Sequence, residues 1–470
     1  MSGERQRKGL RVPAKASLWY IISGAVAKGV GALGTPLFTR LLTPEEYGLY
    51  PLFNTWLAVL SVIVTLELTG SVIYKGLIRF ERRKDEFISA TLGLISLIFA
   101  VVCILNFAFG AKIREITGLS STVSWLLLLQ IYINATLSLY TAKARYEYKY
   151  KGVALLNILI SVASLLISVL IIKLFNINAE ARIIGMLIVT FSISAPIFFS
   201  ILKKSKRFFS FEIWKYLLRF NLPLLPHFLS MSVILRVGEI TIGRALGQTE
   251  LGKYSVALSL GLSLSVITGG ILSALSPWLM RKIKSQSYGE IRSLLHLVTY
   301  TLCIMTLAAL TVYPEVLAIL TPEEYHDALG AIYPLALSVI PVFLSNAVMS
   351  GEMYFEKSAI SALPSIMTAV ITALSSFLLI PRTTYTVSGV ITLASYTTLA
   401  LLNGKVFERL SGKMPYSPKR IVLALLLSGV YALVIYYFKE NILLRLLLSL
   451  PLLPLLIILS VRVYKKVKEI

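Results

Sequence analysis

Two basic residues lie inside long apolar stretches, where a charge needs a partner. Lys28 is 11 residues into the apolar stretch 17–38, and Arg236 lies in a second apolar stretch that begins near Leu218. A cation deep in a bilayer is costly unless it faces water, a carboxylate or an anionic ligand. The two residues therefore predict a water-accessible site that binds an anion. The alternative is that each cation pairs with a structural carboxylate.

Two carboxylates bear on that alternative. With a rise of about 1.5 Å per residue, Lys28 lies roughly 15 Å and Glu67 nearly 30 Å below the outer surface, which disfavours a direct pair. Arg236 has a nearer carboxylate, Glu239, at i+3 on its own helix. Glu239 is also a candidate for coupling to H⁺ or Na⁺, since burial raises a carboxyl pKa. Glu67 is a weaker candidate, because a carboxylate near the cytoplasmic interface needs no special role.

His227 is the third candidate for binding. It stands in LPLLPHF, directly after Pro223 and Pro226, which unwind or kink a helix. Broken helices are typical of transporter binding sites. The imidazole can bond a phosphate or a sugar, or it can cap backbone carbonyls that the prolines leave free; both interpretations stay open.

These residues need membrane-spanning helices to position them. The chain has 470 residues, of which 56% are hydrophobic and 15% charged, and its mean hydropathy is +0.78. Its apolar runs have the length of membrane helices and lack the alternation of a membrane barrel. We expect an all-α polytopic membrane protein with about fourteen transmembrane helices. The predicted starts are near Ser17, Leu49, Phe87, Thr122, Gly152, Ile183, Leu218, Tyr254, Ser293, Leu329, Ala359, Thr386, Ile421 and Ile442.

The basic residues predict the orientation. The termini and every second loop hold 34 of the 46 Lys and Arg residues, and the other loops hold 10. Positively charged loops stay in the cytoplasm, so both termini are expected there, in a cell (plasma or inner) membrane. The ten outer residues are Arg40, Lys112, Arg114, Lys173, Arg182, Arg244, Lys253, Arg382, Lys439 and Arg445.

Two cytoplasmic loops mix cations with aromatic residues. One contains Arg145, Tyr146 and Lys149, and the other contains Arg82 and Arg83. The ordinary interpretation is positive-inside charge with an aromatic belt. The functional alternative is a docking surface for an anionic cargo.

The hexapeptide LTPEEY occurs twice, at 42–47 and at 320–325. In each copy the threonine (Thr43 or Thr321) can cap a helix, proline suits the first helical position, and Glu46 or Glu324 completes a capping box. Both copies fall in predicted outer loops. They are therefore expected to restart a helix that returns into the membrane.

A shift of 204 residues aligns the chain with itself. It places TRLLTPEEYGLY (39–50) on GRALGQTELGKY (243–254), with Arg40 on Arg244 and Tyr50 on Tyr254. Helices 1–6 and 7–12 are thus expected to form two six-helix lobes of the same orientation, a parallel repeat with a substrate site between its halves. The predicted segments are a basic tail (1–16), an N-lobe (17–204), a linker (205–217), a C-lobe (218–410) and two additional helices with a tail (411–470).

Other classes of function find little support. Neither the two cysteines nor the three histidines have metal-ligand spacing, and no hydrolase or nucleotide-binding motif is present. The net charge of +23 is divided among short loops, which argues against nucleic-acid binding. We expect that the protein is not an enzyme and that it binds no metal or cofactor. Coupling of transport to H⁺ or Na⁺ is the one ion dependence considered.

The chain resembles Wzx-type polysaccharide flippases of the multidrug/oligosaccharidyl-lipid/polysaccharide (MOP) superfamily in three stretches. These are TRLLTPEEYGLYPLF, residues 221–261 and LLIPRTTYTVSGVITLASY. The similarity follows nearly the whole chain. Glu239 and Ile240 stand where that family often has Asp-Arg, and Thr383 is among the residues that replace its glycines. Fourteen helices make the chain similar to the lipid II flippases, in which the extra pair helps to form a lipid-facing groove.

The resemblance implies export of a polyprenyl-diphosphate-linked oligosaccharide to the outer leaflet by alternating access. Lys28, Arg236 and His227 would then bind the diphosphate or glycan. Partners would be this lipid, membrane lipid and a glycan polymerase or glycosyltransferases, and a monomer is expected. The alternatives are a cation-coupled multidrug exporter, whose cavity should be acidic, and a non-transporting scaffold for glycan assembly.

Overall fold

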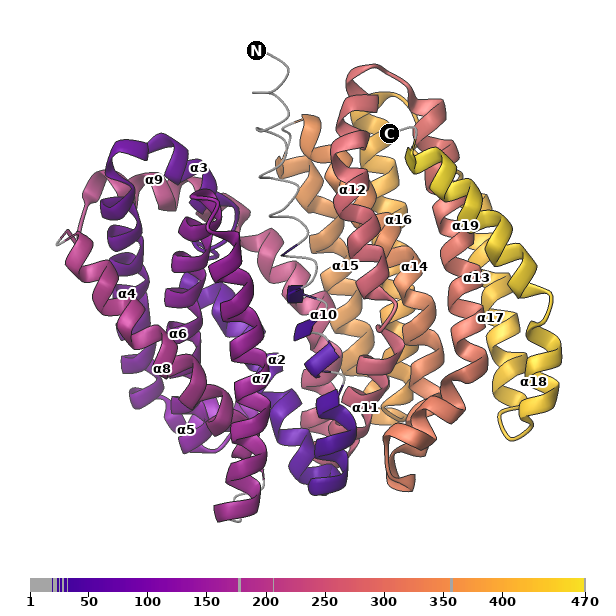
Figure 1. The fold of residues 1–470 in the computed structure, drawn as a ribbon, viewed down its shortest axis with the longest axis horizontal. Coiled ribbons are helices and arrows are strands. Elements are labelled where there is room, and N and C mark those ends of the chain that lie inside the picture. Colours follow the sequence, from indigo (N-terminus) through magenta and orange to yellow (C-terminus); the bar gives the residue numbers. More distant parts are fainter. Residues whose placement is uncertain are drawn as a thin grey trace. The chain divides into compact units, whose positions relative to one another are not determined.

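The computed structural model describes residues 19, 23–24, 26–27, 29–31, 33–175, 179–205, 207–355 and 358–468. Every regular element in these ranges is a helix, which confirms the predicted all-α class (Figure 1). The chain divides into two compact units between Leu229 and Ser230. We call them unit 1 and unit 2 and describe each by itself.

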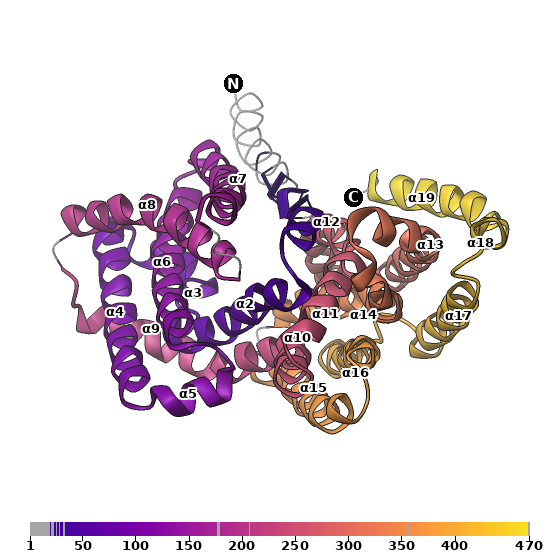
Figure 2. The same ribbon diagram turned by 90° about the horizontal axis from the view of Figure 1, so that it is seen from below.

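Unit 1 combines long apolar helices with short helices at their ends. The long helices are α2 (Pro44–Thr65), α4 (Lys84–Ala108), α6 (Ser121–Tyr146), α7 (Tyr150–Phe175) and α8 (Ala181–Lys204); the short ones are α3 (Ser71–Arg79), α5 (Gly110–Thr117) and α9 (Phe211–Asn221). α6 packs against α2, α4, α7 and α8, and Figure 2 shows it among these neighbours. α9 lies across the start of α4, where the indole of Trp214 donates a hydrogen bond to the carbonyl of Ala90 at 2.8 Å. α6 is thus the central helix of this unit.

Unit 2 contains most of α10 and all later helices. They are α10 (Leu225–Ala245), α11 (Gln248–Gly261), α12 (Ser265–Lys284), α13 (Tyr288–Leu320), α14 (Leu329–Glu352), α15 (Ser358–Leu379), α16 (Thr386–Ser411), α17 (Pro418–Tyr437), α18 (Ile442–Ser449) and α19 (Leu452–Lys468). α14 is largely buried and packs against α11, α12, α13 and α16. It is the central helix of this unit, as α6 is of unit 1.

The described residues hold 11 helices long and apolar enough to cross a membrane, or up to 13 if two bent pairs each form one span. The bent pairs are α11 with the first part of α12, at 46°, and α18 with α19, at 42°. Thirteen of the predicted starts lie within these helices. The first predicted helix, 17–38, is only partly covered by the described residues, so the count of fourteen stays a prediction.

The two LTPEEY copies fold differently. Thr43 caps α2 as predicted: its backbone N–H donates to the Glu46 carboxylate at 2.9 Å, and its hydroxyl accepts from the Glu46 N–H at 3.3 Å. The prediction is wrong for the second copy. α13 continues to Leu320, and the Thr321 hydroxyl donates back to the carbonyl of Leu317 at 2.8 Å. A 3₁₀ helix, η3 (Glu323–Ala328), follows without a side-chain cap.

The helix boundaries repeat at the predicted interval. α2 begins at Pro44 and α11 begins at Gln248, 204 residues later. α4 begins at Lys84 and α13 begins at Tyr288, which is again 204 residues. The ends of α7 and α15 keep the same interval. The two halves of the chain therefore share their pattern of helices, and α17, α18 and α19 follow after the repeat.

Candidate functional site

Arg236 forms the ion pair that its sequence spacing allows. Its Nη1 lies 2.9 Å from Oε1 of Glu239, one turn further along α10. Glu239 is buried, whereas the Arg236 side chain keeps 32% of its surface exposed. A guanidinium has five N–H donors, so Arg236 retains donors for a further acceptor. Lys28, the other predicted cation, lies outside the described residues.

The pair is held in a packed part of unit 2. The buried Tyr254 of α11 and Tyr396 of α16 lie within electrostatic range of the Arg236 charge. A Cβ at Gly238 would lie 2.4 Å from Oγ of Ser388, so glycine is what lets α10 approach α16 this closely. A buried carboxylate is costly without a partner, and Arg236 supplies that partner. The roles of Arg236 in binding and of Glu239 in ion coupling stay predictions.

His227 lies just after an interrupted stretch of helix, as the prolines predict. α9 ends at Asn221, one 3₁₀ turn (η2, Leu222–Leu224) follows, and α10 begins at Leu225. Pro223 lies in the 3₁₀ turn. The His227 side chain is half-buried. Its two proposed roles, a bond to phosphate or sugar and a cap for backbone carbonyls, both stay open.

Glu67 lies in a break between α2 and α3. Leu66 and Glu67 adopt left-handed backbone angles, with φ of 47° and 53°. The side-chain amide of Asn221 donates to the Leu66 carbonyl at 2.7 Å and holds this break from the side of α9. Burial raises the pKa of the Glu67 carboxyl above its usual value. A carboxyl that retains its proton more readily is suited to proton coupling, the role predicted for it.

The basic loops of unit 1 meet at one end of the unit, and carboxylates balance much of their charge. Arg83 Nη2 lies 2.6 Å from Glu212 Oε2, and Lys84 Nζ lies 3.1 Å from Glu147 Oε1. Further pairs are Lys149–Glu147, Lys143–Asp85 and Arg207–Glu86. The loops 75–86, 143–151 and 203–219 therefore share one side, as the charge count predicts.

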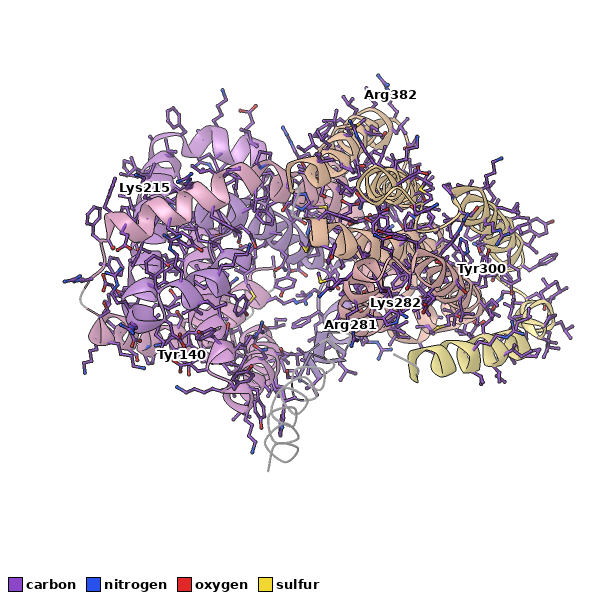
Figure 3. The ribbon with its side chains drawn as sticks, turned by 90° about the horizontal axis from the view of Figure 1, so that it is seen from above. Tyr140, Lys215, Arg281, Lys282, Tyr300 and Arg382 are labelled. Carbon is purple, nitrogen blue, oxygen red and sulfur yellow. The ribbon has the colours of Figure 1, made fainter. Side chains whose placement is uncertain are left out.

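The predicted docking residues have unequal surroundings. Arg83 and Lys149 are engaged in these ion pairs, Arg82 and Arg145 are exposed, and Tyr146 packs against the apolar core of unit 1. Figure 3 labels Tyr140 of α6 and Lys215 of α9 in the same unit. This surface is a network of both charges and not a continuous basic patch. Its role in docking stays a prediction.

A cavity of about 250 Å³ lies within unit 1, lined by α2, α7, α8 and residues of the preceding segment, namely Ala27, Val30, Gly31, Gly34 and Phe38. Arg182 of α8 forms part of its lining, and the guanidinium lies 3.8 Å from the ring centroid of Tyr50 and 4.3 Å from that of Phe38. Ser164 of α7 adds a hydroxyl that is buried without a hydrogen-bond partner. No Asp or Glu is among the residues described as lining this cavity. These described residues present aromatic rings, hydroxyls and one cation.

The sequence reasoning missed this use of Arg182, which it assigned to an outer loop. One local signal was available: Tyr47 and Tyr50 are three residues apart and so lie on one face of α2, and both rings contact Arg182. The arginine that fills the space beside them lies more than 130 residues away. Only the packing of α8 against α2 brings the groups together.

The described residues contain no group of three or more His, Cys, Asp and Glu side chains placed to hold a metal ion. The residues that carry chemistry here are instead cations, hydroxyls and aromatic rings. These groups bind anions and sugars through hydrogen bonds and ring stacking.

Residues 14–283, more than half of the chain, match the family described as polysaccharide biosynthesis protein. The chain belongs to this family. It is also similar to Lsg locus putative protein 1 of Haemophilus influenzae (strain ATCC 51907 / DSM 11121 / KW20 / Rd), with 22% identity over 278 residues that cover 58% of this chain and 67% of the relative.

The fold of this chain is similar to that of solved transporters. The lipid II flippase MurJ, in an inward closed conformation, has a TM-score of 0.68 at 14% identity and covers 96% of this chain and 99% of its own. An inward-facing multidrug resistance MATE family transporter of the MOP superfamily has a TM-score of 0.63 at 14% identity and covers 87% and 96%. The family match and the long apolar helices confirm a multi-pass membrane protein of polysaccharide biosynthesis, and the two solved structures confirm that its fold resembles that of a lipid II flippase and of a MOP-superfamily transporter.

Proposed function

We propose that this protein moves a polyprenyl-diphosphate-linked oligosaccharide from the cytoplasmic to the outer leaflet by alternating access, for the biosynthesis of a cell-surface polysaccharide. The observation that carries the proposal is the lining of the unit 1 cavity, whose described residues include one cation and no carboxylate. Membership of the polysaccharide biosynthesis family supports the same cargo.

The chemistry of the cavity suits a glycan joined to a phosphate. The Tyr50 ring offers a face and a hydroxyl, and the Ser164 hydroxyl lacks a partner in the described structure. Sugars stack their apolar faces on aromatic rings and hydrogen-bond through their hydroxyls. Arg182 retains in-plane N–H donors while its face lies on Tyr50, so it can bind an anionic group without leaving the ring.

A multidrug resistance transporter shares this fold with a lipid II flippase, so the fold does not choose between a drug and a lipid-linked cargo. A cationic cargo calls for unpaired carboxylates at the site. In unit 1 the cavity lining contains none among the described residues, and in unit 2 the buried Glu239 is paired with Arg236. Both observations favour an anionic or neutral polar cargo.

Within this proposal, Lys28, Arg236 and His227 bind the diphosphate or glycan, and Glu239 and Glu67 couple transport to H⁺ or Na⁺. Both termini lie in the cytoplasm, where the paired basic surface of unit 1 receives the cargo. The protein acts as a monomeric transporter and not as an enzyme, and it supplies a glycan polymerase or glycosyltransferases on the outer side.

The test is flipping of a fluorescent lipid-linked oligosaccharide by purified protein in proteoliposomes. Arg182→Gln removes a charge-assisted hydrogen bond and should slow flipping about tenfold, and Lys28→Ala should abolish it. Arg114→Gln is the matched control, because Arg114 is an exposed arginine on α5 of the same unit; it should change the rate less than about twofold. Normal flipping by both Arg182→Gln and Lys28→Ala, or uptake of cationic dyes in preference to the glycolipid, contradicts the proposal.

A further inference from the structure

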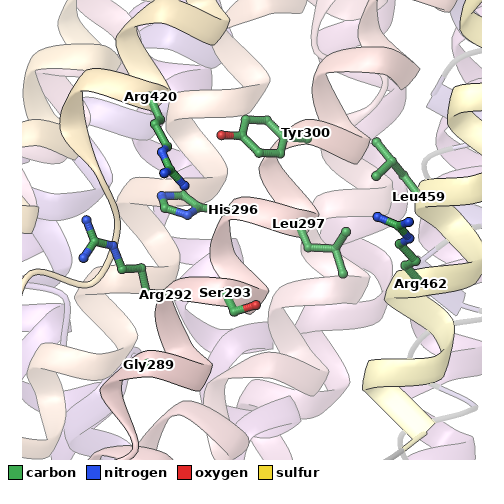
Figure 4. Close-up of a pocket in the computed structure, with 9 residues that line it drawn as sticks. All are labelled: Gly289, Arg292, Ser293, His296, Leu297, Tyr300, Arg420, Leu459 and Arg462. Carbon is green, nitrogen blue, oxygen red and sulfur yellow. The ribbon is translucent and has the colours of Figure 1, made fainter.

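A second cavity, with a volume of about 770 Å³, lies in unit 2 between α13, α17 and α19. Arg292, His296 and Tyr300 lie one turn apart along one face of α13. Arg420 of α17 and Arg462 of α19 complete the polar lining, and Figure 4 shows the side chains around the opening. Three helices thus bring three arginines to one pocket.

These arginines differ from the basic residues of unit 1. None of Arg292, Arg420 and Arg462 lies within 4.0 Å of a described carboxylate, whereas Arg83, Lys84 and Lys149 all do. Three like charges around one cavity repel one another. The arrangement is stabilised when an anion occupies the cavity, so the charge pattern indicates an anionic ligand.

His296 adds a directed donor. The backbone N–H of Ser417 donates to His296 Nε2 at 2.8 Å, which makes Nε2 the acceptor nitrogen of the ring. The proton of the neutral imidazole then lies on Nδ1. The Tyr300 hydroxyl lines the same cavity and can also donate. The polar lining is therefore rich in donors, and an anion with several oxygens, such as a phosphate, satisfies them.

The apolar part of the lining indicates that this phosphate belongs to a lipid. Leu297 and Leu459 line the cavity beside the arginines. Along α17 and α19, large apolar side chains are exposed, among them Leu426, Leu433 and Ile457. These surfaces need acyl chains around them in a membrane. The pocket also lies at the starts of α13 and α17 and near the end of α19, where the predicted cytoplasmic segments are.

We propose that this cavity binds the phosphate headgroup of an anionic membrane lipid in the cytoplasmic leaflet. The charges of Arg292, Arg420 and Arg462 hold the phosphate, His296 and Tyr300 donate hydrogen bonds to it, and the acyl chains lie along α17 and α19. Basic pockets between membrane helices at the cytoplasmic side are suited to such headgroups. The bound lipid joins the C-terminal helices to α13, and this role does not depend on which cargo is transported.

The experiment measures lipid binding to the full-length protein by native mass spectrometry, with phosphatidylglycerol and phosphatidylcholine offered together. The triple variant R292Q/R420Q/R462Q removes the pocket charges and should lower phosphatidylglycerol binding about tenfold or more. The matched control R281Q/K284Q/R409Q removes three exposed cations outside the pocket, at the ends of α12 and α16, and should change binding less than about twofold. Figure 3 labels Arg281 beside Lys282 on α12.

Arg462→Gln alone guards against misfolding, because Arg462 is exposed on α19 and its loss leaves the helix packing intact. It should lower phosphatidylglycerol binding about threefold. Thermal stabilisation by phosphatidylglycerol, with none by inorganic phosphate at equal concentration, supports a lipid ligand. Equal loss of binding in the pocket and control variants overturns the proposal, and so does equal stabilisation by free phosphate. Glycolipid flipping is measured separately, so either proposal can fail without the other.

Discussion

Arg445 of α18 is almost fully enclosed, with 1% of its side chain exposed, and forms a two-point ion pair with Glu315 of α13. Nη1 lies 3.0 Å from Oε2, Nη2 contacts Oε1, and Nη1 also donates to the carbonyl of Thr311. The two charged residues are 130 positions apart. The pair therefore attaches the C-terminal helices to the body of unit 2.

Replacing Glu315 by Ala should lower the free energy of unfolding by about 3 kcal/mol, because it leaves a buried guanidinium without its carboxylate. Thermal unfolding of the purified protein in detergent measures the change. Glu440→Ala is the control, since Glu440 is 89% exposed and pairs loosely with Lys439; its effect should stay within about 0.5 kcal/mol. Equal losses in the two variants would show that pairing the buried Arg445 stabilises the protein no more than an exposed ion pair does.

The same substitution should destabilise the protein more in the first LTPEEY copy than in the second. Thr43→Val removes the hydroxyl that caps α2 and should cost about 1 kcal/mol. Thr321→Val removes only a hydrogen bond back to Leu317 and should cost less than about 0.5 kcal/mol. Thermal unfolding of both variants makes the comparison. A larger loss at Thr321 would show that the second copy acts as a cap.

Glu147 gives unit 1 a pH-dependent contribution to stability. Burial alone would raise its pKa, but hydrogen bonds from Lys149 and Lys84 and the charge of Lys143 lower it from 4.5 to about 2. A lowered carboxyl pKa stabilises the fold above the unfolded value of 4.5, and this contribution is lost as the pH falls toward about 2. At pH 7 the free energy of unfolding of Glu147→Gln should therefore be about 1–2 kcal/mol lower than that of the wild type. This difference between the two proteins should disappear near pH 2. A gap that is constant with pH contradicts the pKa assignment.

Two glycines in unit 1 should respond in opposite directions to an added methyl group. A Cβ at Gly185 of α8 would lie 2.7 Å from the backbone nitrogen of Ser168, so Gly185→Ala pushes α7 and α8 apart. The expected cost is about 2–3 kcal/mol. At Gly152 of α7 nothing lies within 4 Å of such an atom, and Gly152→Ala should stabilise the helix by up to about 1 kcal/mol. Unfolding temperatures of the two variants decide this, and a neutral Gly185→Ala would mean that α7 and α8 can separate freely.

Much of the fold could be predicted because it depends on local physics. A membrane helix forms all its backbone hydrogen bonds within one segment, and that segment is visible in the sequence as a single apolar run. Thirteen predicted starts therefore fall within helices. The Thr43 cap uses groups only three residues apart. The 204-residue interval appears in the letters and again in the helix boundaries. The Arg236–Glu239 pair could be anticipated for the same reason, because one turn of helix fixes its distance.

The tertiary structure decided which basic side chains pair with a carboxylate and which do not. Arg182 and Arg445 look alike as outer-loop cations in the sequence, yet one lies on aromatic rings and the other is buried and paired with Glu315. The second LTPEEY copy has the same sequence as the first, but its threonine does not cap a helix, because α13 extends to the residue before Thr321. Arg292, Arg420 and Arg462 share a pocket only through the packing of three helices. Sequence spacing sets distances within one helix, whereas distances between helices depend on how their surfaces pack, and that packing determines where this protein can bind an anion.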